Sequence, residues 1–398
     1  MRSRYVIKLL CVLAQCGIAS KRAEMLLHTS DTNRKAMIKQ MEEKGWIKKG
    51  EAEYHYYYYF PKEGTYVWRK KKEKRHALYH VEARYSEYKD CFKSDVKEMA
   101  KRSALRLQSQ NENTQKRALR QSEILAMMLE ANVGFSALNE SRLKAEYGGE
   151  EKPFYVEARE LKEKMTSTEK GRIGFSGLGS RAYGSMVARG EVYTIYDIEN
   201  HDFMRFTPTY EQSYKALEQS AFGVEVVNKR IFFCNSYDKL EKILFKSITP
   251  ITEMRKKVEE RGKERLLGSN QYRESFLIAK SHEGQKIVEL LAATTQDDWM
   301  EYLNLSNEKQ ETAYPIFCSG WEKRGNTYIY SYNFLTQDLE GLYEFLIQVD
   351  ALNRFSHGNI TDRYVIHCFS EIGEVLEKMD THCEIVVHDV EDAYLALL

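Results

Sequence analysis

Hydrophobic residues in the first 45 positions recur at helical spacing in three successive segments. The first segment places Val6, Leu9 and Leu13 on one face, which is the spacing of an amphipathic helix. Turn and capping residues separate the segments, and Ser20 is an N-cap residue type directly before the second. We therefore expect three helices at the start of the chain, over residues 5–16, over residues 21–28, and from the polar cluster 29–33 to about residue 44.

A strongly β-prone run follows the third helix. Aromatic residues fill most of positions 54–60, and the turn at Pro61–Gly64 precedes a return strand over residues 65–68. The hairpin is expected to begin near residue 46. Three helices followed by a hairpin is the element order of a winged helix-turn-helix, a DNA-binding module.

Charge is distributed unevenly along a chain whose net charge is only +1. Residues 1–75 carry 18 Lys and Arg against 8 Asp and Glu, and residues 76–120 carry 10 against 6. The remaining 278 residues hold 32 against 45. A basic N-terminal region thus precedes an acidic one, and a local basic surface is what phosphate binding requires.

Side chains of the second and third helices and of the hairpin are the expected DNA contacts. The N-terminal part of the third helix meets base edges and phosphates in a helix-turn-helix. We expect Arg34, Lys35 and Lys39 to lie outward there. The full predicted set is Lys21, Arg22, Thr32, Asn33, Arg34, Lys35, Lys39, Lys48, Lys49, Lys62, Arg69, Lys70, Lys71 and Lys72. Two alternatives stay open: a helical cap with a solvated charge run, and a winged helix used for protein contacts.

The predicted fold class is α+β, in three regions. Residues 1–75 are the winged helix-turn-helix, residues 76–150 a helical connector or dimerisation arm, and residues 151–398 an acidic body in which strands and helices alternate. In the body, two strands are expected to meet at a tight turn at Arg189–Gly190. A strand, a helix and a strand over residues 364–390 predict a parallel pair with a crossover helix.

Four stretches resemble the replication-relaxation type of protein, carried on plasmids and integrative conjugative elements of Gram-positive bacteria. They are the winged-helix start, residues 116–128, residues 154–162, and residues 180–187 followed by 192–196 and 204–206. The resemblance implies a DNA-binding accessory protein that acts in replication, conjugative transfer or their transcriptional control. Some proteins of this type have a body related to restriction-type nucleases. Asp197 and Glu199 end a strand here without the lysine of such a site, so a nuclease-like body would be degenerate.

Three functions follow from these patterns. The first is binding of double-stranded DNA, without enzymatic activity or a cofactor. The second is a metal-dependent nuclease that uses Asp197 and Glu199 on DNA delivered by the winged helix. The third is a protein-interaction module. A homodimer and contacts with replication or transfer proteins are open alternatives for further partners.

Other residue groups favour structural roles. The zinc-ligand types near the C-terminus and the acidic pairs are better explained by ordinary strands and solvated loops. The cysteines form no Cys-x-x-Cys pair, which favours a reduced, cytoplasmic protein, and no apolar stretch approaches a membrane-spanning length. The groups considered are His367, Cys368, His382, Cys383, His388, Asp297, Asp298, Asp389, Glu391, Asp392 and the Gly-rich segment 174–179.

Overall fold

The chain divides into two units. A computed structural model describes residues 4–16, 18–43, 47–52, 55–59, 112–135, 153–162, 179–202, 204, 208–248, 267, 272–305, 316–355 and 362–398. The first unit consists of Met1–Asn139, Lys152–Val156 and Lys280–Gln285. The second consists of Glu140–Glu151, Glu157–Ala279 and Lys286–Leu398. Each unit is described by itself below.

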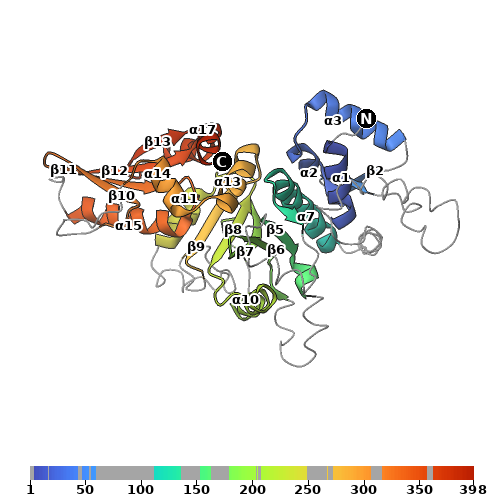
Figure 1. The fold of residues 1–398 in the computed structure, drawn as a ribbon, viewed down its shortest axis with the longest axis horizontal. Helices are drawn as coiled ribbons and strands as arrows, with labels where there is room; N and C mark the ends of the chain where they lie inside the picture. The colour runs from blue at the N-terminus through green and yellow to red at the C-terminus, as the bar shows by residue number, and fades with distance from the viewer. Residues whose placement is uncertain are drawn as a thin grey trace. The chain divides into compact units, whose positions relative to one another are not determined.

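The first unit contains helices and short strands (Figure 1). The three helices predicted at the start of the chain are confirmed, whereas residues 76–111 of the predicted connector lie outside the described residues. Ser20 caps the second helix, because its hydroxyl accepts a hydrogen bond from the Ala23 N–H at 2.9 Å. In chain order the elements are α1 (Arg4–Cys16), β1 (Ile18–Ser20), α2 (Lys21–Leu26), α3 (Asp31–Glu43), β2 (Lys48–Ala52), β3 (His55–Tyr59), α7 (Glu112–Glu130), β4 (Gly134–Phe135) and β5 (Phe154–Glu157).

Three of these strands form a small antiparallel sheet. β3 lies between β1 and β2. Tyr59 of β3 is the register partner of Ile18 in β1 and of Lys48 in β2. The predicted strand in the aromatic run is therefore confirmed as β3. The strand β1 was not expected from the sequence, since three residues are too few to show a periodic pattern. The turn at Pro61–Gly64 and the return strand over 65–68 lie outside the described residues.

α7 packs against α1, α2 and β1. Its inner face carries Ile124, Leu125 and Met128, all fully buried. At its end, Glu130 pairs with the Lys8 ammonium of α1 at 2.7 Å. α7 thus shares one core with the N-terminal helices, although the sequence places it in the predicted connector.

The second unit contains two mixed sheets with their helices. Its predicted mixture of α and β structure is confirmed. A short helix over residues 158–162 comes first. The elements that follow are β6 (Gly184–Ala188), β7 (Glu191–Glu199), α10 (Pro208–Phe222), β8 (Lys229–Cys234), α11 (Leu240–Ile248), β9 (Glu274–Ala279), α13 (His282–Ala293), α14 (Gln296–Tyr302), β10 (Gly320–Arg324), β11 (Thr327–Asn333), α15 (Leu339–Phe355), β12 (Arg363–Phe369), α16 (Ser370–Leu376), β13 (Glu384–His388) and α17 (Val390–Leu397).

The strands β6, β7, β8 and β9 lie in that order. β6 and β7 form the predicted hairpin, and its turn residues Arg189 and Gly190 have positive φ angles of 49° and 76°. Such angles match a two-residue turn to the twist of the strands. β7, β8 and β9 run parallel, and β7 is buried from Val192 to Ile198. Both faces of β7 are therefore covered, and the buried stretch includes the polar residues Thr194 and Asp197.

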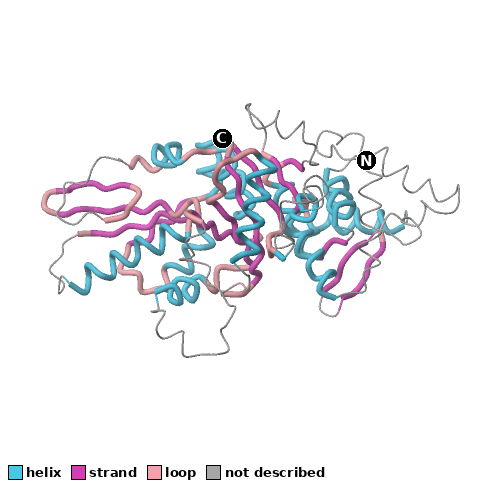
Figure 2. The backbone as a smooth tube through the Cα atoms, turned by 90° about the horizontal axis from the view of Figure 1, so that it is seen from below, coloured by secondary structure: helices cyan, strands magenta, loops and turns pink. Residues whose placement is uncertain are grey.

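The other sheet has the order β10-β11-β12-β13. β11, β12 and β13 are parallel, and α16 connects the last two, as the sequence predicted. α15 lies alongside this sheet in both views (Figures 1 and 2). Its Phe345 ring stacks on Tyr332 of β11, with the ring centroids 5.5 Å apart.

Two further observations concern the described part of the chain. None of its helices combines the length and the apolar character that crossing a membrane requires. Its cysteines, at positions 11, 16, 234, 318, 368 and 383, are free thiols.

Candidate nucleic-acid interface

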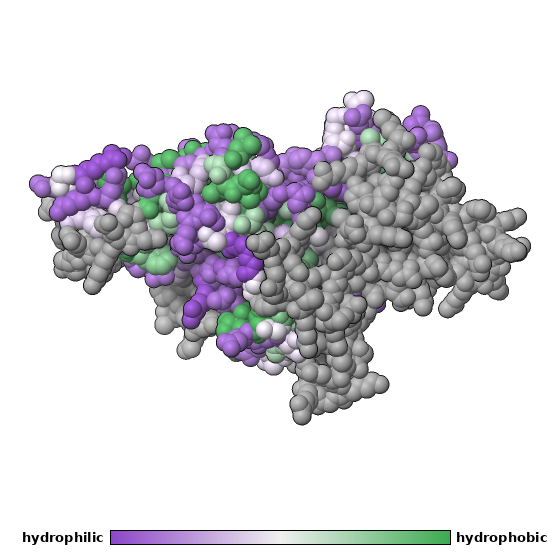
Figure 3. Space-filling view, in the orientation of Figure 1, coloured by the Kyte–Doolittle hydropathy of each residue, from purple (hydrophilic) through white to green (hydrophobic). Residues whose placement is uncertain are grey.

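α3 has one buried and one exposed side. Its buried positions are Arg34, Ile38 and Met41, at the three- and four-residue spacing of a single helix face. The opposite side is largely hydrophilic where it is visible in Figure 3. The exposed residues of the helix are Asp31, Thr32, Asn33, Lys35, Ala36, Lys39, Gln40, Glu42 and Glu43.

The prediction that Arg34 lies outward is wrong. Its side chain is only 9% exposed, and its Nε lies 2.7 Å from Oε1 of Glu24, whose side chain is 1% exposed. A second guanidinium nitrogen lies 2.8 Å from the Asp31 carboxylate. Charges are buried in proteins when they are paired, so Glu24 draws Arg34 inward. Arg34 thus joins α3 to α2, whereas the adjacent Asn33 and Lys35 are exposed.

Glu24 is the centre of this network. It also accepts a hydrogen bond from the Tyr5 hydroxyl at 3.1 Å and pairs with the Lys21 ammonium. One buried carboxylate therefore connects α1, α2 and α3. Sequence reasoning missed it, and the available signal was an acidic residue within an otherwise apolar segment of the second helix.

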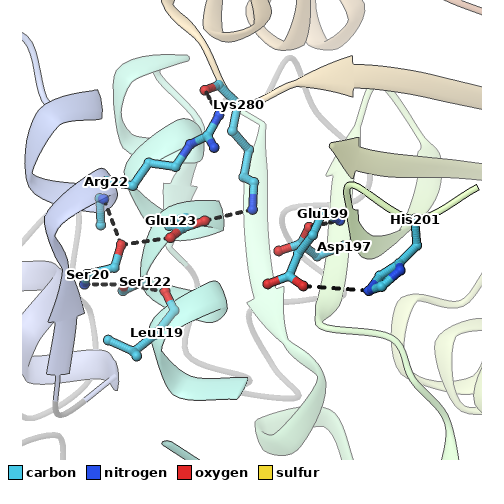
Figure 4. Close-up of polar contacts among 10 residues, drawn as sticks. Ser20, Arg22, Leu119, Ser122, Glu123, Asp197, Glu199, His201 and Lys280 are labelled. Carbon is cyan, nitrogen blue, oxygen red and sulfur yellow. Dashed lines mark hydrogen bonds and ion pairs between the residues drawn. The ribbon is translucent and has the colours of Figure 1, made fainter. Parts of the chain in front are cut away.

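The predicted contact Arg22 also has partners within the first unit (Figure 4). Its guanidinium donates to the Lys280 carbonyl oxygen at 3.0 Å. The Lys280 ammonium is fully buried and lies 2.6 Å from Glu123 of α7, which accepts from the Ser20 hydroxyl at 2.8 Å. These contacts connect the start of α2 to α7, so Arg22 helps to hold these two helices together.

The remaining predicted contacts fall into three groups. Thr32, Asn33, Lys35 and Lys39 are exposed on α3, and Lys39 lies 3.9 Å from Glu43 in a solvated pair. Lys48 and Lys49 lie in β2, opposite Tyr59 and Tyr58, and their side chains are outside the description. The third group lies outside the described residues and consists of Lys62, Arg69, Lys70, Lys71 and Lys72.

The carboxylates of the nuclease hypothesis lie at an irregular strand end in the second unit (Figure 4). The buried Asp197 accepts the backbone N–H of Glu199 at 2.9 Å. Glu199 has a positive φ of 51°, and its carboxylate lies 4.0 Å from the exposed His201 ring. Within the described ranges, no three or more His, Cys, Asp or Glu side chains are grouped so that they could hold a metal ion.

The C-terminal histidines form a direct pair. Nδ1 of His367 and Nε2 of His388 lie 2.9 Å apart. Burial, together with the neighbouring His388, lowers the pKa of His367 to about 4. Cys368 is fully buried, and its thiol lies 4.0 Å from the Val386 carbonyl oxygen. His367 and Cys368, adjacent on β12, thus have different contacts on β13.

A buried acidic group on α10 was not expected from the sequence. Glu218 is fully buried and accepts hydrogen bonds from Ser185 at 2.6 Å and from Thr194 at 2.7 Å. Burial raises the pKa of Glu218 to about 8. On the same helix, Glu211 accepts from the Tyr196 hydroxyl at 2.6 Å. Glu211 and Glu218 lie on the buried face of α10, and their hydrogen bonds hold this helix against β6 and β7.

Comparison with known proteins gave no relative: no family model, no curated sequence and no solved structure matched the chain.

Proposed function

We propose that the chain binds double-stranded DNA as an accessory protein of a mobile genetic element, in the cytoplasm, where it acts in replication, conjugative transfer or their transcriptional control. The first unit is the DNA-binding part, as a winged helix-turn-helix. The link to a mobile element rests on the resemblance to replication-relaxation proteins.

The observation that carries the proposal is the exposed side of α3. The buried Glu24 and Arg34 hold α3 against α2, and β2 and β3 of the sheet β1-β3-β2 follow α3 in the chain. Three helices and a small antiparallel sheet form the framework of a winged helix-turn-helix. Such a framework leaves one face of the third helix free to enter a major groove.

The chemistry of that side is suited to a polyanion. Lys35 and Lys39 are exposed cations, and Thr32 and Asn33 add hydrogen-bonding side chains near the start of the helix. The N-terminus of a helix carries partial positive charge and unsatisfied N–H groups, which favours phosphate nearby. The basic composition of residues 1–75 points the same way.

The test is fluorescence anisotropy of a labelled random-sequence duplex titrated with the full chain at several salt concentrations. The variant carries Lys35→Ala and Lys39→Ala, and it leaves the buried Arg34 intact. We expect wild-type affinity to fall steeply with salt. In the variant, affinity falls about tenfold at low salt, and the slope of log K against log salt decreases by about 2, one for each lost phosphate contact.

A matched control carries Lys242→Ala and Lys378→Ala, two exposed lysines of the second unit. It loses the same charge and should bind within twofold of wild type, as roughly expected for residues outside the interface. Absence of binding at low salt would contradict the proposed function. An equal loss in the control would show that α3 is not the contact surface.

A further inference from the structure

We propose that the exposed side of α3 reads A·T base pairs through the side-chain amides of Asn33 and Gln40. Thr32 and Ala36 lie between these amides and the two lysines, Lys35 and Lys39. This inference rests on the proposed function and adds the class of DNA site to it. It depends on how the exposed residues are arranged around the helix.

The exposed side consists of three parallel stripes. Lys35 and Lys39 are four positions apart and form a basic stripe. Asn33 and Gln40 are two turns apart and form an amide stripe on the other flank. Thr32 and Ala36 form the stripe between them.

The central stripe consists of small side chains. Ala36 and Thr32 allow the helix backbone to approach the floor of a major groove closely, and both present a methyl group. The thymine C5-methyl is the apolar feature of that groove, and Ala and the Thr methyl are residue types that contact it. A large or charged residue in the middle of the helix face would prevent this approach.

The amide stripe has the matching hydrogen-bonding groups. The side-chain amide of Asn or Gln can make two hydrogen bonds to adenine at once: its NH₂ group donates to N7, and its oxygen accepts from the N6 amino group. Asn33 and Gln40 lie two turns apart, or about 10 Å along the axis, which is the span of about three base pairs. Both residues can therefore address adenines within one short site.

The basic stripe is better suited to phosphates than to bases. Because both cations lie on one flank, they face one strand of the duplex when the central stripe faces the base edges. Glu42 and Glu43 are exposed at the far end of the helix and would be repelled by phosphates. Their position implies that α3 faces the DNA from Thr32 to Gln40 and that only its last turn, with Glu42 and Glu43, points away from it.

The experiment is selection of binding sites from a random duplex library with the full chain, followed by anisotropy on the enriched and on G·C-substituted sites. We expect enriched sites that share a core of A·T pairs. Replacing one core A·T pair by G·C should weaken wild-type binding about tenfold, as for loss of one bidentate contact.

Two double variants separate the roles of the stripes. Asn33→Ala with Gln40→Ala should reduce the preference for the enriched site by about tenfold or more while leaving affinity for the random duplex within about threefold. Lys35→Ala with Lys39→Ala should weaken binding to both duplexes alike and keep their ratio. Circular dichroism confirms that each variant is folded.

Several outcomes would overturn the inference. Enriched sites with a G·C core would contradict it, as would an unchanged preference in the Asn33 and Gln40 variant. In both cases, salt-sensitive binding that depends on Lys35 and Lys39 would leave the proposed function intact. Absence of any DNA binding would instead remove the proposed function, and this inference with it.

Discussion

Charged residues have opposite roles on α3 and on α10. On α3, Lys35 and Lys39 are exposed and can meet a partner of opposite charge. On α10, Glu211 and Glu218 are buried and accept hydrogen bonds from hydroxyl groups of β6 and β7 or the segment before β6. The first pair is suited to recognition and the second to holding a helix on a sheet. A count of charges along the sequence cannot make this distinction, because it depends on burial.

Arg34 shows that the distinction also applies within one helix. It lies next to Lys35 in the sequence, but it is buried against Glu24. Its position on the inner face, with Ile38 and Met41, decides its role. The following predictions test the contrast between buried and exposed charges.

The largest effect is expected from Glu24→Ala. This change leaves the buried Arg34 paired with the exposed Asp31 carboxylate and without the Glu24 carboxylate. It also removes the carboxylate that accepts the Tyr5 hydroxyl hydrogen bond. Loss of one member of a buried ion pair destabilises a protein by about 3–5 kcal/mol. Urea denaturation followed by circular dichroism would measure the loss. A change below about 1 kcal/mol would mean that Glu24 and Arg34 do not form a buried pair in solution.

A smaller effect is expected from Glu218→Gln, and it depends on pH. Burial raises the pKa of Glu218 from 4.5 to about 8. Between these values the unfolded chain loses the proton while the folded chain retains it, so the free energy of unfolding should fall as the pH rises. The fall is complete above about pH 8. Glutamine has no proton to lose, and it should reduce the difference in Tm between pH 5 and pH 8 by on the order of 5 °C.

Calorimetry of the full chain at several pH values would measure this difference. Asp338, whose pKa burial raises to about 7, contributes in the same direction and should leave a residual pH dependence in the variant. The exposed Glu377→Gln serves as a control and should behave as wild type. A wild-type Tm that rises from pH 5 to pH 8 through this window, and is unaffected by Glu218→Gln, would contradict the prediction.

The smallest effect is expected from Glu43→Ala. Glu43 and Lys39 are 63% and 76% exposed and lie 3.9 Å apart. Solvated pairs of this kind contribute up to about 0.5 kcal/mol, so the free energy of unfolding should change by no more than that. The same denaturation measurement as for Glu24→Ala gives a direct comparison. A loss similar to that of Glu24→Ala would remove the contrast between the two sides of α3.

Local patterns in the sequence were sufficient for most secondary structure. Helical spacing predicted α1, α3 and α7, and the two-residue turn at Arg189–Gly190 predicted the hairpin of β6 and β7. These features depend on residues close together in the chain, where periodicity and turn chemistry act. The strand β1 was missed because its pairing with Tyr59 is not visible in three residues.

Tertiary structure alone decided which charges are available. Arg34 is buried in a pair with Glu24, which lies on another helix. Lys280 is buried in a pair with Glu123, which lies 157 positions away in the sequence. Glu218 is surrounded by hydroxyl groups of two strands. The sequence by itself determined most of the helices and strands, although not β1, and it determined which region is basic. It could not determine which cations are exposed, because the desolvation and pairing of a charge depend on residues that only the fold brings together.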